Sequence, residues 1–215
     1  MRLSVIISFF VVSSAQATWA QNAYFRLGKQ AYIDANFKQA VMQLEKGLML
    51  DSTNTNALFM LGYSYYHSND YLKSINTFTR QLNIVPTESS AFYYRALAKE
   101  YLGKDVQLSA TDRERYLLGA IADFTKAINF SPNDDKITSF YQNRGIAYRE
   151  YALFKLQPNL RTYDKSRGID ALKASITDLE RILATDGTRS DIAAQLDISK
   201  DKLSDAIGRQ RKIKN

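Results

Sequence analysis

Few residues in this sequence could carry out nucleophilic or acid–base chemistry. The 215-residue chain has one histidine, His67, and no cysteine. His67 precedes Ser68 directly, but neighbouring side chains on a helix point in different directions, so they do not form a nucleophile–base pair. Asp178 and Glu180, two residues apart on an expected helix, fail for the same reason. The sequence also contains no Gly-rich phosphate loop and no metal-ligand cluster, so we expect no catalytic, metal or cofactor site and no enzymatic activity.

Residue types in the first half of the chain recur with a 34-residue period, which indicates the helices that position the side chains. The matched pairs are Leu27 and Leu61, Gly28 and Gly62, Phe37 and Tyr71, Leu44 and Phe78, and Leu50 and Ile84. A small residue in a first helix and apolar residues in a second, repeated at this interval, are typical of stacked helix-turn-helix units. Small residues let two helix axes approach closely, and larger ones fill the space beside them. The pattern predicts an all-α solenoid, an architecture that usually presents a surface for another molecule.

The N-terminus has the pattern of a secretory signal peptide, which we assign to residues 1–20. A positive start precedes a ten-residue apolar run, residues 3–12, and an A-x-A end follows it. The run is shorter than the roughly 20 residues that span a bilayer. Cleavage after Ala17 and cleavage after Ala20 both fit, and an uncleaved anchor and a buried first helix remain as alternatives. Export, together with the lack of cysteine, favours a bacterial periplasm or exterior.

Composition and charge narrow the class of partner. Hydrophobic residues make up 45% of the chain, enough for a continuous core, and tyrosine, with 14 copies, is the most frequent aromatic residue. The formal net charge is +7, which favours acidic partners. Export argues against nucleic acid, and we expect membrane contact only at the periphery.

Two segments of the second half bring the repeat close to a known family. Residues 120–128, AIADFTKAI, are followed by Pro132, and residues 141–148 read YQNRGIAY. These segments resemble the second and first helices of tetratricopeptide repeats, and the resemblance extends over residues 21–188. It implies a right-handed α-solenoid of about four units with a C-terminal capping helix. The units would span residues 21–54, 55–88, 89–134 and 138–187.

The third and fourth units are longer than the first two. The small residues of the two helices lie 12 apart in the first units, as in Gly62 and Ser74, but 24 and 30 apart in the later ones. The extra residues, 104–115 and 153–170, fall in the turn between the two helices, and both loops and helix extensions would accommodate them. Their cations form a second candidate binding site, with solvated decoration as the alternative. These cations are Arg113, Arg115, Lys155, Arg161, Lys165 and Arg167.

The family resemblance also implies where a partner binds. In tetratricopeptide repeats the first helices of successive units line a concave groove. Carried over residue by residue, the groove side chains are Phe25, Lys29, Tyr32, Phe59, Tyr63, Tyr66, Tyr93 and Tyr101. Tyrosine offers a large rigid face with a polar tip, which suits partner binding. The alternative is that several of these rings pack between units.

The C-terminal residues 189–215 are expected to form a capping helix with a basic tail. Ile192, Leu196, Leu203 and Ile207 recur at spacings of four, seven and four, which is a helical stripe, and the other faces are polar. Such a helix closes the open end of a solenoid. The sequence therefore favours an exported scaffold that binds a protein or peptide partner. The alternative is a self-associating subunit of an envelope assembly, and the sequence leaves the oligomeric state open.

Overall fold

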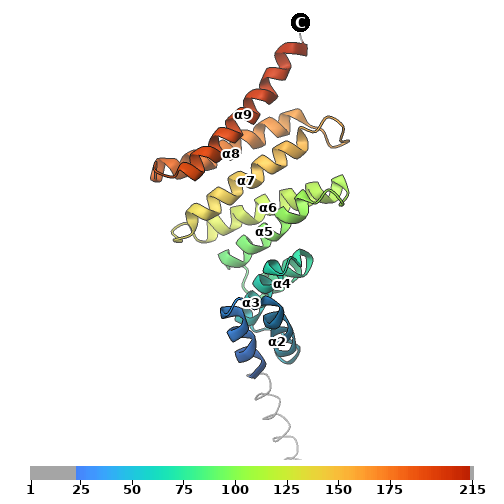
Figure 1. Cartoon of the computed structure of the whole chain (residues 1–215), viewed down its shortest axis with the longest axis vertical. Coiled ribbons are helices and arrows are strands. Elements are labelled where there is room, and N and C mark those ends of the chain that lie inside the picture. The colour runs from blue at the N-terminus through green and yellow to red at the C-terminus, as the bar shows by residue number, and fades with distance from the viewer. Residues whose placement is uncertain (1–22, 214–215) are drawn as a thin grey trace, which may run out of the picture. The chain divides into compact units, whose positions relative to one another are not determined.

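The computed structural model describes residues 23–213, with side chains up to residue 208 (Figure 1). The expected signal peptide and the end of the basic tail therefore lie outside the described residues. All regular structure in residues 23–213 is helical. Of these helices, none combines the length and apolar character needed to cross a membrane. The expectation of an all-α repeat fold is confirmed.

The chain divides into two compact units between Thr87 and Glu88. The described part of unit 1, residues 23–87, contains four helices, which form two antiparallel hairpins. They are a helix over residues 23–33, α2 (Phe37–Leu50), α3 (Thr55–His67) and α4 (Tyr71–Ile84). Each hairpin corresponds to one of the two regular repeats, and α3 packs between α2 and α4.

The two hairpin turns of unit 1 have the same geometry, one period apart. Ala35 and Asn69 have positive φ angles of 55° and 62°. In each turn the next amide donates to a carbonyl five residues back, Asn36 to Ala31 at 2.8 Å and Asp70 to Tyr65 at 2.9 Å. This is the Schellman arrangement that ends a helix with a left-handed residue. The side chains of Asn36 and Asp70 then cap α2 and α4.

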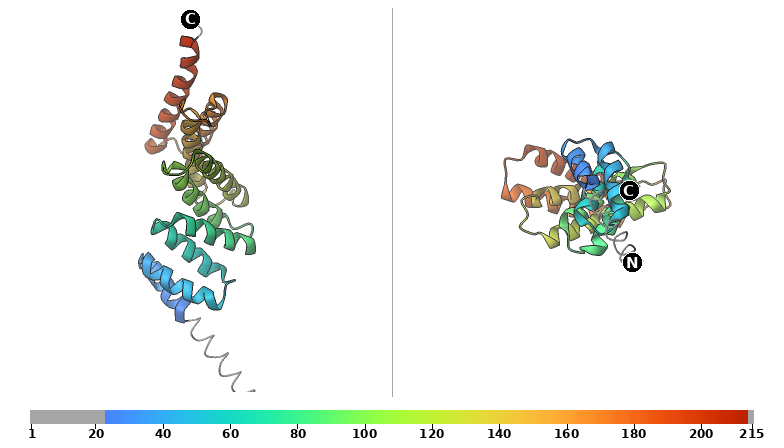
Figure 2. Two further views of the ribbon diagram at one scale, coloured as in Figure 1. Left: turned by 90° about the vertical axis from the view of Figure 1, so that its right-hand side faces the viewer. Right: turned by 90° about the horizontal axis from the view of Figure 1, so that it is seen from below.

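Unit 2 contains two longer hairpins and a final helix (Figures 1 and 2). Its elements are α5 (Ser89–Lys104), α6 (Ala110–Phe130), α7 (Ile137–Lys155), α8 (Lys165–Thr185) and α9 (Ser190–Ile213). α9 packs on α8, where Ile192 and Leu196 join Leu179 and Ile182 in a buried cluster. The stripe predicted for the capping helix thus supplies two of the residues that bury α8.

The extra residues of the third and fourth units are partly helix and partly loop. In residues 104–115 only 105–109 are non-helical, and in residues 153–170 the loop covers 156–164. The helix extensions approach each other at glycines. A Cβ on Gly103 would lie 2.6 Å from Leu117, and one on Gly168 would lie 2.7 Å from Leu156. The lengthened hairpins are therefore packed as tightly as the regular ones.

Candidate functional site

The largest cluster of aromatic rings in unit 1 is centred on Tyr63. We call it the aromatic surface, and its members are Tyr32, Phe37, Phe59, Tyr63, Tyr66 and His67. The ring of Tyr63 lies 5.2 Å from that of Tyr32, edge to face, and 4.3 Å from the imidazole of His67. His67 stacks on Phe37 at 4.7 Å. Four groove residues predicted for the first two repeats therefore come together, namely Tyr32, Phe59, Tyr63 and Tyr66.

The aromatic surface is accessible and uncharged at neutral pH. His67 is the most exposed ring of this surface, and the other five rings are half-buried. Their positions on α3, 59, 63, 66 and 67, share one helix face. Burial, followed by the influence of Tyr63, raises the pKa of Tyr32, and burial lowers the pKa of His67. The rings therefore present apolar faces with neutral polar tips, which can contact a partner without desolvating a charge.

The other two groove residues predicted for unit 1, Phe25 and Lys29, lie on the first helix together with Tyr32. Phe25 packs inward, because its ring occupies the place that a Cβ on Gly47 would need. Lys29 is exposed on the same helix, one residue after Gly28. Lys29 is thus the cation that the prediction placed at the surface, and Phe25 supports the helix that carries it.

In unit 2 the predicted groove tyrosines have separate environments. Tyr93 packs edge to face against Phe124 at 5.7 Å and lies 4.9 Å from Phe140, and its hydroxyl accepts a hydrogen bond from Asn143 at 2.8 Å. Burial raises its pKa. Tyr93 therefore holds α5, α6 and α7 together. Tyr101 is 46% exposed, with the ammonium of Lys104 4.9 Å above its ring.

Ionic groups replace tyrosine at matching positions of unit 2. Tyr32 and Tyr66 each lie four residues after the small residue of a first helix, and Glu100 and Arg149 hold this position in the later repeats. Glu100 is 5% exposed and pairs with Lys104 at 2.8 Å, and burial raises its pKa although Lys104 opposes the change. Arg149 donates to the side chain of Gln195 on α9 at 2.6 Å. The first-helix face of unit 2 is therefore polar and internally paired.

Two of the six predicted insertion cations are structural. Lys155 is 4% exposed and pairs at 3.1 Å with Glu114, which also accepts from the hydroxyl of Tyr151. Arg113 donates to the carbonyl of Gly103 at 3.2 Å, and its guanidinium covers the ring of Phe154 at 5.1 Å. Both residues join the third repeat to the fourth.

The remaining insertion cations are more accessible. Arg115 and Arg167 pair locally with Asp112 and Asp164, and Arg161 is exposed. Lys165 is half-buried and lines a pocket of 410 Å³ between the 156–164 loop and α9, whose other walls include Tyr163, Lys202 and Asp205. The structure does not gather the six predicted cations into one patch.

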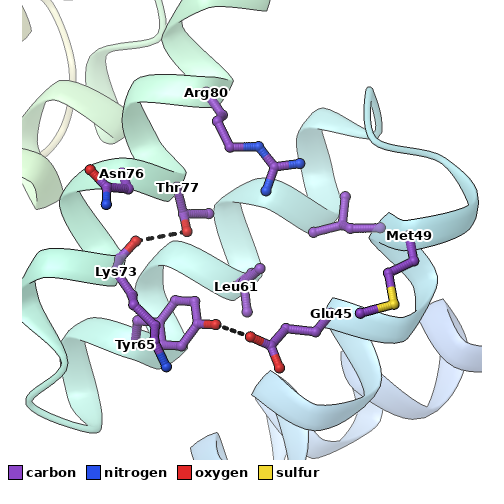
Figure 3. A pocket seen from close by; sticks show the side chains of 9 residues that line it. Glu45, Met49, Leu61, Tyr65, Lys73, Asn76, Thr77 and Arg80 are labelled. Carbon is purple, nitrogen blue, oxygen red and sulfur yellow. Dashed lines mark hydrogen bonds between the residues drawn. The ribbon is translucent and has the colours of Figure 1, made fainter.

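A second hollow, which was not predicted from the sequence, lies in unit 1. We call it the α2–α4 pocket. It has a volume of 410 Å³, and its walls come from α2, α3 and α4 (Figure 3). They are Glu45, Leu48, Met49, Leu61, Tyr65, Lys73, Asn76, Thr77 and Arg80. The only sequence signal for it is the short polar side chains Asn76 and Thr77 between two long cations on α4.

Comparison with known proteins rests on structure. The sequence matches no protein-family model, and no curated protein matches it. The C-terminal part of a TPR repeat-containing protein from Cytophaga hutchinsonii matches with a TM-score of 0.57 at 21% identity, over 90% of this chain and 66% of that one. MamA from Desulfovibrio magneticus RS-1 matches with a TM-score of 0.54 at 13% identity, over 90% of this chain and 96% of that one. The TPR domain of Arabidopsis OM64 matches with a TM-score of 0.50 at 16% identity, over 60% of this chain and 96% of that one.

This chain has the tetratricopeptide-repeat fold. Its two regular TPR hairpins form unit 1, and the two lengthened TPR hairpins with the terminal helix form unit 2. Among the residues that the structure describes, no three His, Cys, Asp or Glu side chains gather as metal ligands would. The features with binding geometry are therefore the aromatic surface and the pockets.

Proposed function

We propose that this TPR chain is an exported, non-catalytic scaffold that binds a protein or peptide partner on the aromatic surface of unit 1. The observation that carries the proposal is the accessible cluster around Tyr63, in which six rings converge from two repeats. Rigid aromatic side chains lose little conformational entropy on binding, so they contribute strongly to interfaces. The fold supports this role, because TPR proteins commonly act as interaction scaffolds.

The chemistry of the surface favours an extended segment with apolar side chains and an acidic character. Neutral rings provide the apolar contacts, and the exposed Lys29, three residues before Tyr32 on the same helix, offers a cation to a carboxylate. The net charge of +7 adds long-range attraction for an acidic partner. Export to a bacterial periplasm or exterior remains part of the proposal, and the sequence pattern of residues 1–20 supports it.

Replacing two rings tests the proposed site. We expect the double variant Tyr63→Ala, Tyr66→Ala of the mature chain to capture at least tenfold less partner from a cell-envelope extract, because it removes the centre of the surface. Tyr116→Ala, which removes a half-buried tyrosine of unit 2 that lines neither pocket, should capture normally. Circular dichroism checks folding. Unchanged capture by a folded double variant would rule out the aromatic surface as the site.

A second candidate function, self-association, is favoured by an exposed face of the first repeat. Leu27 is 50% exposed, whereas its counterpart Leu61, one period later, is 3% exposed. Met42, on the neighbouring helix, is 45% exposed. Sedimentation equilibrium of the mature chain tests this function, because a monomer at micromolar concentration would contradict it. Leu27→Gln should shift any dimer toward monomer.

A further inference from the structure

The α2–α4 pocket and the aromatic surface use opposite faces of α3. Leu61 and Tyr65 point into the pocket, while Phe59 and Tyr63 belong to the aromatic surface. Successive helical residues differ by about 100° in direction, so these two pairs lie roughly half a turn apart. A ligand in the pocket would therefore not compete with one on the aromatic surface.

The floor of the pocket is apolar and fixed, and its rim is adaptable. Leu48, Leu61 and Tyr65 are 5%, 3% and 6% exposed. Met49 is 82% exposed at the rim, next to this floor (Figure 3). Methionine can rearrange around different apolar groups because its side chain is flexible and polarizable. The pocket therefore suits one aliphatic side chain of a partner.

Three polar groups of the pocket already have partners. Figure 3 shows the hydroxyl of Tyr65 donating to the carboxylate of Glu45, and the hydroxyl of Thr77 donating to the carbonyl of Lys73 at 2.8 Å. Burial, reinforced by the bond to Glu45, raises the pKa of Tyr65, so this donor stays protonated at neutral pH. The ammonium of Lys73 lies 5.3 Å above the Tyr65 ring and 3.2 Å from Asp70.

Two donors on the same wall remain available. Arg80 and Asn76 are exposed, and neither forms an ion pair or side-chain hydrogen bond within the described part of the chain. They are four residues apart on α4, so they share a helix face. A guanidinium binds a carboxylate through two parallel hydrogen bonds, and a neighbouring amide can add a third. Among the charged residues that line the pocket, Lys73 and Arg80 outnumber Glu45, so the lining favours an anion.

We propose that the α2–α4 pocket is a second binding site, which receives an acidic peptide segment. One aliphatic side chain of the segment occupies the floor beside Met49, and a carboxylate binds to Arg80 and Asn76. This site goes beyond the proposed function, because it lies on another face of unit 1 and needs none of the rings of the aromatic surface.

The test uses the full mature chain and two defined probes. One is a terminally blocked hexapeptide of alternating glutamate and leucine, and the other has glutamine in place of glutamate. Binding is followed by amide chemical-shift changes in NMR titrations. We expect the acidic peptide to shift amides of α2 and α4 around the pocket, and the glutamine peptide to bind at least tenfold more weakly because it lacks the carboxylates.

Matched charge reversals separate the pocket from general electrostatics. Arg80→Glu should weaken binding of the acidic peptide at least tenfold, and Arg80→Gln should weaken it less. Lys46→Glu is the matched control, because it changes the net charge by the same amount at the equivalent position of the first repeat. Lys46 lies over the ring of Tyr24 at 5.8 Å, outside the pocket, so this variant should change the affinity for the peptide less than twofold. The Tyr63→Ala, Tyr66→Ala variant should bind the peptide normally, so failure of this proposal is distinct from failure of the aromatic surface.

Three outcomes would overturn the proposal. Equal losses of affinity for the acidic peptide in Arg80→Glu and Lys46→Glu would show non-specific charge attraction. Equal binding of both peptides would show that no carboxylate is recognised. Shifts confined to amides of unit 2 would place the site elsewhere.

Discussion

Two buried ion pairs hold matching positions in the lengthened repeats. Arg95 and Arg144 directly precede the small residue of a first helix, and each guanidinium forms two bonds of 2.7–2.8 Å to an aspartate of the second helix, Asp123 or Asp178. The second regular repeat has Leu61 and Thr77 at the matching positions. The ion pairs therefore distinguish unit 2 chemically and fix how its paired helices meet.

Removing one partner of such a pair should be costly. Asp123 is 4% exposed and also binds Lys99 at 2.7 Å, so Asp123→Ala would leave two cations without their counter-charge. We expect a loss of about 3–5 kcal/mol in the free energy of unfolding, measured by urea denaturation. Asp170→Ala, at an exposed pair with a 3.9 Å separation, should change it by less than about 1 kcal/mol. Similar losses for both variants would contradict a buried ion pair.

His67 should make the stability of unit 1 depend on pH. Partial burial among the rings lowers its folded-state pKa below the ordinary value of 6.5, so the unfolded chain binds more protons just below that pH. Stability should consequently fall as the pH drops from 6.5 through the folded-state pKa. NMR titration of this single imidazole gives the folded pKa directly. His67→Gln should remove this part of the pH dependence, and a folded pKa above 6.5 would reverse the expected sign.

The sequence predicted the aromatic surface better than the ionic contacts. Tyr32 and Tyr66 are one period apart, and Phe25 and Phe59 likewise, so the repeat itself places them on successive first helices. Tyr93 follows the same period but packs inward, because Phe124 and Phe140 surround it. Neither phenylalanine is near Tyr93 in sequence. The bond between Lys155 and Glu114 likewise joins residues 41 positions apart, which no local pattern reveals.

At the scale of elements, glycines determine how closely the helix extensions pack. A Cβ on Gly103 would lie 2.6 Å from the Leu117 side chain and 3.1 Å from its backbone nitrogen. Gly103→Ala should therefore cost about 1–3 kcal/mol of unfolding free energy through displacement of α6. Gly208, in α9, has no atom within 4 Å of an added Cβ, so Gly208→Ala should stabilise by up to about 1 kcal/mol. Thermal unfolding of both variants measures the difference. Equal shifts in the unfolding midpoint would contradict the close approach of Leu117 to Gly103.

The turns of unit 1 offer a stabilising substitution. Ala35 has a φ of 55°, a conformation that an L-residue with a Cβ adopts at a cost. Ala35→Gly should stabilise the chain by about 0.5–1 kcal/mol in urea denaturation, the gain being reduced by the flexibility of glycine in the unfolded state. Asn69→Gly, at the matching turn, should gain less because asparagine tolerates this region better. A loss of stability in Ala35→Gly would show that the turn is not strained.

The sequence predicts which turn each insertion lengthens, but it leaves open whether the extra residues form loops or helix extensions. The spacing of small residues identifies the turn that is lengthened, because those residues mark where the helices meet. The extra residues of the third unit contain good helix formers on both sides of Ser109, which caps α6 through the amide of Asp112. The fourth contains Pro158, which lies in its loop. Where a helix ends depends on contacts such as Leu156 against Gly168, which sequence spacing alone does not give.

At the scale of the molecule, the structure has two compact units where the sequence suggested one continuous repeat domain. Unit 1 has a buried cluster of its own around Leu44, Leu58 and Leu61. In the described part of unit 2, buried clusters lie around Phe124 and Leu172 and where α9 covers α8. In repeat proteins, stability is approximately the sum of repeat terms and nearest-neighbour interfaces. Each unit therefore contains the contacts that an independently folding fragment needs.

We accordingly expect a fragment of residues 88–215 to fold by itself. It keeps all five helices of unit 2, both buried ion pairs, and Glu88, whose side chain caps α5. Circular dichroism should show high helicity, and urea should unfold the fragment in one cooperative transition.

A shorter fragment, residues 109–215, is the matched control. It removes α5, which separates Asp123 from Arg95 and exposes Phe124 where Tyr93 covered it. This fragment should lose cooperative unfolding or at least 3 kcal/mol of stability, in line with the cost of breaking a buried ion pair. If residues 88–215 were unfolded alone, or if both fragments were equally stable, the division of the chain at Glu88 would not correspond to a folding unit.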